Sequence, residues 1–259
     1  MSAAQPIVLR TDALKKSFGE LKVARDISIE LPRGARHALI GPNGAGKTTF
    51  INLITGMLKS DSGRIELDGK DITRAPAAER VRAGLTRTFQ INTLFPDLTP
   101  VEAVTLAVTE RERTAGQFWT GLPSHRAAID EAVGILEQLR LADVATRKTR
   151  TLPYGQQRLL EIALALATKP KVLLLDEPAA GVPKDESAAL FSVIAALPSD
   201  ISVLFIEHDM DIVFSFATRI IVLVSGGVLM EADPATVRSD PRVREVYLGH
   251  ADLSGVGHG

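Results

Sequence analysis

The segment RHALIGPNGAGKT at residues 36–48 decides the fold. Its first five residues form a largely apolar run of strand length, and its last eight fit the pattern G-x-x-x-x-G-K-[ST] at every fixed position. A helical pattern follows over about 47–57, so the motif has the strand and helix that it requires on its two sides. A glycine-rich turn with a chance lysine would rarely meet all these conditions, and the segment therefore predicts a phosphate-binding loop.

Each part of this loop has a physical role toward a nucleotide. Glycines let the backbone curl so that successive N–H groups point at phosphate oxygens, and the helix N-terminus adds partial positive charge. Lys47 is placed to reach the β- and γ-phosphates, and Thr48 to offer its hydroxyl to Mg²⁺. The nucleotide-binding residues that we predict here are Gly41, Pro42, Asn43, Gly44, Ala45, Gly46, Lys47, Thr48 and Thr49.

Composition narrows the class of protein. The 259 residues are 45% hydrophobic, which is enough for a substantial core, and they carry 30 basic against 31 acidic side chains. The net charge of -1 gives no reason to expect nucleic acid as a partner, and the absence of cysteine excludes disulfides. No apolar run approaches the ~18 residues of a membrane span, and residues 1–10 lack a signal-peptide core. We therefore expect a soluble or peripheral protein kept in the cytosol.

The order of apolar runs predicts an α/β fold. Residues 7–17 and 21–31 have the texture of antiparallel strands. Strand-sized runs at 172–175, 203–206 and 219–224 alternate with helical patterns at 155–167, 186–196 and 209–216, which favours a mainly parallel sheet with helices on both faces. The stretch 99–145 has long polar helical faces and is interpreted as a helical insertion. We expect one domain over 1–259, with a core at about 1–95 and 165–250, a helical subdomain at about 96–164 and a flexible tail at 251–259.

Three polar side chains follow two of the predicted strands. Asp176 and Glu177 end the run at 172–175, where burial is costly for carboxylates unless a cation or a reacting group needs them. Asp176 fits the role of holding Mg²⁺, and Glu177 that of polarising the attacking water. A helix N-cap is the structural alternative, which the phosphate loop makes the weaker one. His208 follows the run at 203–206, on the sheet edge where ligands bind, and is placed to contact the γ-phosphate or the water.

Taken together and in this order, these pieces resemble the ABC ATPases, over about residues 9–249. Leu-Pro-Tyr-Gly-Gln-Gln-Arg at 152–158 occupies the place of the family's signature loop, which implies nucleotide contacts from Gly155 and Gln156. Gln90 matches the Q-loop glutamine, and Phe18 occupies the place of the aromatic residue that stacks on adenine. The alternatives are a plain surface role for Gln90 and a core position for Phe18.

The resemblance implies a P-loop NTPase core with an N-terminal antiparallel β subdomain and an inserted α-helical subdomain. It implies ATP and Mg²⁺ as ligands, and catalytic roles for Lys47, Gln90, Glu177 and His208. It also implies that Thr48, Gln90 and Asp176 hold the metal. Two such chains would form a head-to-tail dimer, with each ATP between the phosphate loop of one subunit and the signature helix of the other.

Several sequence motifs resemble those of one branch of the family, the ATP-binding subunits of branched-chain amino-acid importers and their amide and urea relatives. They are Arg-Thr-Phe-Gln at 87–90, Tyr-Gly-Gln-Gln-Arg at 154–158, Glu-Pro-Ala-Ala-Gly at 177–181, Ile-Glu-His-Asp-Met at 206–210 and Val-Tyr-Leu-Gly at 246–249. The partners implied are a second ATPase subunit in a homo- or heterodimer, membrane permeases docked near Gln90, and an extracytoplasmic solute-binding protein. The resemblance also implies that the chain works at the cytoplasmic face of the inner membrane. Alternatives are a lipopolysaccharide-export ATPase, whose signature keeps serine and glycine, and a soluble ABC protein acting on ribosomes or DNA.

The chain departs from the family pattern at three positions. Pro153 and Tyr154 replace the usual serine and glycine of the signature, and Pro183 stands where the loop at 179–183 usually carries Asp or Asn. Loss of the serine hydroxyl removes a donor to the partner's γ-phosphate, while proline is tolerated in a first helical turn. An asymmetric heterodimer or a subunit that binds ATP without hydrolysis would fit these departures. Phe118 and Trp119 match no motif; we expect them to fill the helical lobe, with cover for the permease groove as the alternative.

Overall fold

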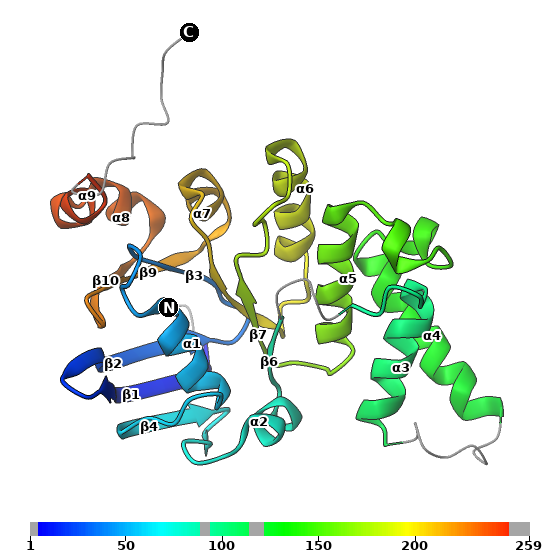
Figure 1. Cartoon of the computed structure of the whole chain (residues 1–259), viewed down its shortest axis with the longest axis horizontal. Coiled ribbons are helices and arrows are strands. Elements are labelled where there is room, and N and C mark those ends of the chain that lie inside the picture. The colour runs from blue at the N-terminus through cyan, green and yellow to red at the C-terminus, as the bar shows by residue number, and fades with distance from the viewer. Residues whose placement is uncertain (1–4, 89–93, 114–121, 249–259) are drawn as a thin grey trace, which may run out of the picture.

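The computed structural model describes residues 5–88, 94–113 and 122–248, and two sheets organise it (Figure 1). The larger sheet has the strand order β10-β9-β3-β8-β7-β6. Its strands are β3 (Arg36–Ile40), β6 (Leu85–Arg87), β7 (Val172–Asp176), β8 (Ser202–Ile206), β9 (Arg219–Val224) and β10 (Gly227–Ala232). All neighbours pair in parallel except β10 with β9, so the mainly parallel sheet is confirmed. The edge strands β6 and β10 were not expected from the sequence.

The smaller sheet is antiparallel and confirms the N-terminal β subdomain. Its order is β2-β1-β4-β5, with β1 (Ile7–Phe18), β2 (Leu21–Pro32), β4 (Ser62–Leu67) and β5 (Lys70–Asp71). Along β1 and β2 the buried side chains come mostly at every second or third residue, as expected for strands with one face on a core and bulges between.

Most of the remaining secondary structure of the described chain is helical. They are α1 (Lys47–Thr55), α2 (Ala77–Ala83), α3 (Pro100–Arg111), α4 (Leu122–Gln138), α5 (Tyr154–Leu166), α6 (Lys184–Ala195), α7 (Met210–Phe216), α8 (Pro234–Ser239) and α9 (Pro241–Leu248), with short 3₁₀ turns at Ala142–Val144 and Thr149–Thr151. The helices expected at 47–57, 155–167, 186–196 and 209–216 are confirmed to within two residues at each end. Across the described ranges, none of these helices has both the length and the apolar composition of a bilayer-spanning segment.

The segment that was interpreted as a helical insertion is helical where the structure describes it. Helix α3 begins with a capping box, in which Thr99 accepts from the Glu102 N–H and Glu102 accepts from the Thr99 N–H, and Pro100 occupies the first turn. Helices α3 and α4 pack on each other and on α5, to one side of the large sheet (Figure 1). The subdomain limits of about 96–164 stay a prediction, and Phe118 and Trp119 lie outside the described residues.

The core forms two layers because side chains of adjacent strand residues point to opposite faces of the sheet. Ala38 and Ile40 of β3 lie in one cluster, together with side chains of α5, α6 and α7. Leu39, between them, lies in the other cluster, with side chains of α1 and of the antiparallel sheet. The expectation of helices on both faces therefore holds, with the correction that the antiparallel sheet shares one face with α1. This packing brings the carboxyl ends of β3, β7 and β8 to one edge.

His37 in β3 makes the stability of the fold dependent on pH. Its side chain is 2% exposed, its Nδ1 has no hydrogen-bond partner, and burial together with the charge of Arg219 lowers its pKa to about 4. Glu231 Oε1 lies 4.0 Å away but also accepts from Arg219 Nε at 3.1 Å, so its charge is shared. The folded state favours neutral imidazole, so this stability is complete above pH 6.5 and is lost as the pH falls toward 4.

We therefore expect the free energy of unfolding of the wild type to lose about 2.5 kcal/mol more than that of His37→Leu between pH 7.5 and pH 4.5. Urea titrations of both proteins at a series of pH values measure this difference, and carboxylates that titrate in the same window cancel in it. Parallel pH profiles for the two proteins would contradict the assignment.

Candidate functional site

The loop at 41–46 joins the buried end of β3 to α1, and its glycines are dictated by close backbone contacts. A Cβ on Gly41 would lie 2.2 Å from the Leu223 carbonyl oxygen of β9, and one on Gly46 would lie 2.7 Å from the Val23 carbonyl oxygen of β2. Gly46 also has φ of 101°, a left-handed conformation that costs glycine little. Helix α1 has no side-chain cap and no acidic residue in its first turn, so its N-terminal N–H groups are available to an anion.

Lys47 lies over this loop. Its side chain is buried, and Nζ donates to the carbonyl oxygens of Gly41 at 2.6 Å and Pro42 at 3.1 Å. Burial lowers the pKa of Lys47, while the nearby carboxylates of Glu177 and Asp176 act in the opposite direction. The ammonium group is thus held at the mouth of the loop by backbone dipoles and by negative charge from β7.

A cleft of about 360 Å³ brings most of the predicted residues together. Its lining comes from β2, from the loop and α1, and from the ends of β7 and β8: Leu21, Val23, Asn43, Gly44, Ala45, Gly46, Lys47, Thr48, Thr49, Glu177 and His208. We call it the loop cleft. Residues from positions 21 to 208 converge here because the parallel strands end at one edge of the sheet.

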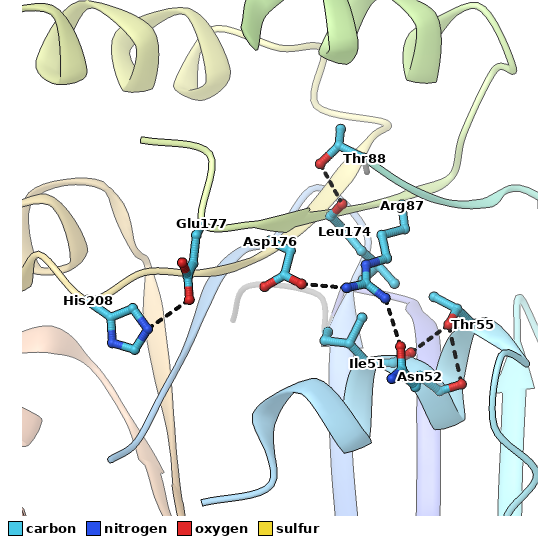
Figure 2. A network of polar contacts seen from close by, with 9 residues as sticks. All are labelled: Ile51, Asn52, Thr55, Arg87, Thr88, Leu174, Asp176, Glu177 and His208. Atoms are coloured by element: carbon cyan, nitrogen blue, oxygen red, sulfur yellow. Dashed lines mark hydrogen bonds and ion pairs between the residues drawn. The ribbon is translucent and has the colours of Figure 1, made fainter. Parts of the chain in front are cut away.

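Glu177 and His208 face each other in this cleft (Figure 2). Glu177 Oε1 lies 2.9 Å from His208 Nε2, and the Glu177 N–H donates to the Ile206 carbonyl at 3.0 Å. Glu177 has φ of 49°, in the left-handed region, which is unfavourable for a residue with a side chain. Both side chains are partly exposed, so the pair can reach a water molecule in the cleft.

Asp176 points to the other side of the strand end, toward Arg87 of β6 (Figure 2). The Arg87 guanidinium lies 2.5 Å from Asp176 Oδ2 and donates to Asn52 Oδ1 of α1 at 2.8 Å. Sequence reasoning assigned no role to Arg87, because 89 positions separate it from its partner and no local pattern links them. Gln90, three residues after Arg87, lies outside the part of the chain that the structure describes.

Glu207 is a second residue that the sequence did not single out. It is 5% exposed, accepts from the Ala179 N–H at 2.8 Å through Oε1, and accepts from the His208 N–H at 3.2 Å through Oε2. Burial raises the pKa of its carboxyl, and the charge of Glu177 adds to that effect. Through these two hydrogen bonds, Glu207 links the loop after β7 to the loop after β8.

Gly155 and Gln156 lie in the first turn of α5 and do not line the loop cleft of their own chain. Helix α5 begins directly after Pro153, which has φ of -53°, so the expectation that proline leaves the fold intact is confirmed. No side chain caps this helix start, which leaves its N–H groups available.

Phe18 stands at the end of β1, opposite Leu21 of β2, which lines the cleft. Its ring is 54% exposed, so the alternative of a core position is wrong. Lys16 Nζ lies 5.6 Å from the ring centroid. Tyr247 of α9 is a further residue without a predicted role: burial raises its pKa to about 12, against the effect of a hydrogen bond with the Gly41 backbone.

Comparison with known proteins identifies the family of the chain. Residues 24–180 match the family described as ABC transporter, and residues 228–252 match the one described as branched-chain amino acid ATP-binding cassette transporter. The chain is 39% identical to the high-affinity branched-chain amino acid transport ATP-binding protein BraF of Pseudomonas aeruginosa, with 94% of this chain and 98% of that one aligned. Its identity to LivG of Escherichia coli K12, a protein described in the same words, is 38%, over 96% and 100% of the two chains.

Solved structures give the same result. The chain superimposes with a TM-score of 0.81 on an ATP-binding cassette of an ABC transporter in its ADP conformation, at 34% identity over 95% of this chain and 100% of that one. A nucleotide-free cassette from an ABC transporter gives a TM-score of 0.81 at 35% identity, over 93% and 99% of the two chains. The chain therefore belongs to the ABC transporter family, as one of its ATP-binding cassettes.

Proposed function

We propose that this chain binds and hydrolyses ATP to power the import of branched-chain amino acids, or of related hydrophobic amino acids and amides, as a subunit of an ABC transporter. The observation that carries the ATPase assignment is the loop cleft, where the Glu177–His208 pair faces Lys47 and Thr48. The solute follows from the names of the relatives, because the loop cleft is built for a nucleotide.

The chemistry follows from the placement of charges. Lys47 and the N-terminus of α1 stabilise the negative charge that grows on the γ-phosphate oxygens as the bond to ADP breaks. Glu177 accepts a proton from the attacking water, which makes the water a better nucleophile. His208 Nε2, 2.9 Å from Glu177 Oε1, holds this carboxylate in place and contacts the γ-phosphate. Phe18, exposed beside the cleft, is placed to stack on the adenine ring.

The donor set fits Mg²⁺ that arrives with the nucleotide. Asp176 and Thr48 would supply one carboxylate and one hydroxyl, with Asp176 binding through Oδ1 because Arg87 pairs with its Oδ2. The described residues contain no group of three or more His, Asp or Glu side chains that would hold a metal by themselves. Mg²⁺ sites of this kind take one or two protein oxygens and complete their shell with phosphate and water. The ion would neutralise charge on the β- and γ-phosphates, with Gln90 as the further ligand that the family resemblance implies.

Removal of Mg²⁺ is therefore expected to abolish ATP turnover, and the chain alone is expected to bind Mg²⁺ only weakly. Calorimetric titration of Mg²⁺ into the chain, with and without a non-hydrolysable ATP analogue, measures the difference. Asp176→Asn should weaken the nucleotide-dependent signal at least about tenfold, since it removes a hard anionic ligand. Tight Mg²⁺ binding without nucleotide would contradict this site.

The partners that we propose follow from two surfaces of the chain. The N-terminus of α5 lies outside the loop cleft, which suits contact with ATP held by a second ATPase subunit, in a homo- or heterodimer. A separate groove of about 350 Å³ lies between α1, α2, β6 and α5, with the apolar lining Met57, Ala77, Val81, Leu85, Leu164 and Ala165. Met57 is 61% exposed, and Thr88 of this groove is two residues from Gln90. We assign the groove to a permease segment, and we propose that the chain works at the cytoplasmic face of the membrane.

Proteoliposomes test the proposal. They would contain the complex of this chain with its permeases, ATP inside and the solute-binding protein outside. We expect ATP-dependent uptake of radiolabelled leucine, isoleucine or valine, and loss of uptake when the complex carries Glu177→Gln. Normal ATP hydrolysis without uptake of any of the three amino acids or of related amides would support the ATPase assignment and exclude these compounds as the transported solute.

A further inference from the structure

Tyr154 joins the start of α5 to the loop at 179–183, which follows β7. Its hydroxyl donates to the Ala180 carbonyl at 3.0 Å. A Cβ on Gly181 would lie 3.1–3.2 Å from the hydroxyl and ring atoms of Tyr154, and Gly181 has φ of 78°. Gly181 therefore packs closely against the tyrosine ring, at a position where glycine provides both the space and the backbone conformation.

Arg158, one turn further along α5, adds to this contact. Its guanidinium lies 5.3 Å from the centroid of the Tyr154 ring, donates to the same Ala180 carbonyl at 3.4 Å, and pairs with Glu161 at 2.9 Å. Arg158 is 5% exposed, so its contacts with the ring and with the Ala180 carbonyl are shielded from water.

The first residue of the same loop, Ala179, is linked to the Glu177–His208 pair. The Ala179 N–H, next to Ala180, donates to Glu207, and Glu207 also accepts from the His208 N–H. His208 in turn contacts Glu177. Hydrogen bonds thus connect Tyr154 to the Glu177–His208 pair, with the covalent link between Ala180 and Ala179 and that between the backbone and the ring of His208 completing the connection.

We propose that Tyr154 is a positioning residue that makes the N-terminus of α5 and the loop at 179–183 move as one body with the Glu177–His208 pair. The proposal rests on the proposed function, because α5 would serve the ATP of the opposing subunit while Glu177 and His208 serve the ATP of this one. Pro153 offers no hydroxyl, so the N–H groups at the start of α5 are the donors left for the opposing γ-phosphate. We call the contacts of Tyr154 with Ala180, Gly181 and Arg158 the tyrosine clamp. The clamp sets the position of these N–H groups, which therefore move together with the Glu177–His208 pair.

Tyr154→Phe tests the clamp, because it removes the hydroxyl and leaves the ring against Arg158 and Gly181. Thr151→Val is the matched control: Thr151 lies three residues earlier, is exposed, and donates its hydroxyl to the Lys148 carbonyl at 2.7 Å, away from the loop at 179–183. ATP turnover would be measured against ATP concentration in the complex with the permeases and the second ATPase subunit. ATP affinity would be measured by fluorescent-nucleotide titration of the full chain alone.

We expect Tyr154→Phe to lower kcat about three- to tenfold, the size of effect for one lost hydrogen bond, and to reduce the Hill coefficient for ATP. The ATP affinity of the chain alone should stay within about twofold of the wild type, because the phosphate loop is untouched, and Thr151→Val should change neither quantity. A merely structural role would lower thermal stability without separating kcat from affinity.

A double-mutant cycle with Glu207→Gln provides an independent check. Since both residues act through the loop at 179–183, the combined loss in kcat should be clearly smaller than the product of the single losses. Wild-type kcat in Tyr154→Phe, or a parallel loss of ATP affinity in the chain alone, would overturn the clamp. A wild-type complex without any ATP turnover would instead overturn the proposed function, and the clamp with it.

Discussion

Glu177→Gln is expected to lower kcat for ATP hydrolysis about 10²- to 10³-fold, the effect of losing a general base. Glutamine has the same shape and can keep the contact with His208, but it cannot accept a proton from water. ATP binding should be unchanged, because Lys47 and the loop remain in place. Measuring phosphate release in the complex, together with ATP affinity in the chain alone, separates the two effects.

Glu137→Gln serves as the control for this substitution, since Glu137 is exposed on α4 and remote from the loop cleft. The equivalent substitution in the second ATPase subunit tests the asymmetric dimer that Pro153 and Pro183 suggest. If the partner subunit's equivalent carboxylate matters less than Glu177, this chain holds the more competent site. Unchanged turnover in Glu177→Gln would show that hydrolysis does not depend on this residue.

Lys47→Met is expected to weaken ATP binding roughly 30- to 100-fold, which corresponds to the loss of charge-assisted hydrogen bonds to phosphate. Methionine keeps much of the side-chain length and can stay buried, but it has no donor for the phosphates. It also leaves the Gly41 and Pro42 carbonyl oxygens without the ammonium that they accept from. Isothermal titration with ATP measures the change, and turnover should fall with it.

Lys59→Met controls for the loss of one positive charge near α1, because Lys59 is exposed just beyond the end of the helix. The control should bind ATP as the wild type does. If both variants lost affinity equally, the effect of Lys47 would come from general electrostatics rather than from contact with phosphate.

The central part of the fold was predictable because its signals are local. Strands β3, β7, β8 and β9 are short apolar runs, and the first three are each followed by a turn and a helical pattern. The edge strands β6 and β10 gave no such signal: β6 has three residues, two of them polar, and every residue of β10 is only half-buried. Helices α2, α8 and α9 span only seven, six and eight residues, which is too short for an apolar helical period to stand out in the sequence.

The sequence predicted which residues form the loop cleft, but it did not predict the long-range contacts that hold them in place. Lys47, Thr48, Glu177 and His208 stand at strand ends and in a motif, so their meeting in one cleft follows from strand order. The Arg87–Asp176 pair, the buried carboxylate of Glu207 and the Tyr154 clamp all join segments that are distant in sequence. Burial and long-range pairing create these contacts, and neither is visible in a local pattern.

A tagged pull-down of this chain from detergent-solubilised native membranes, with the bound proteins identified by mass spectrometry, tests its role in transport. We expect recovery of multi-span permeases together with a second ATP-binding cassette, and an increase in recovery when ATP is present. Recovery of the chain alone, or with ribosomes or DNA, would contradict the role in transport and leave only the chemistry of the loop cleft.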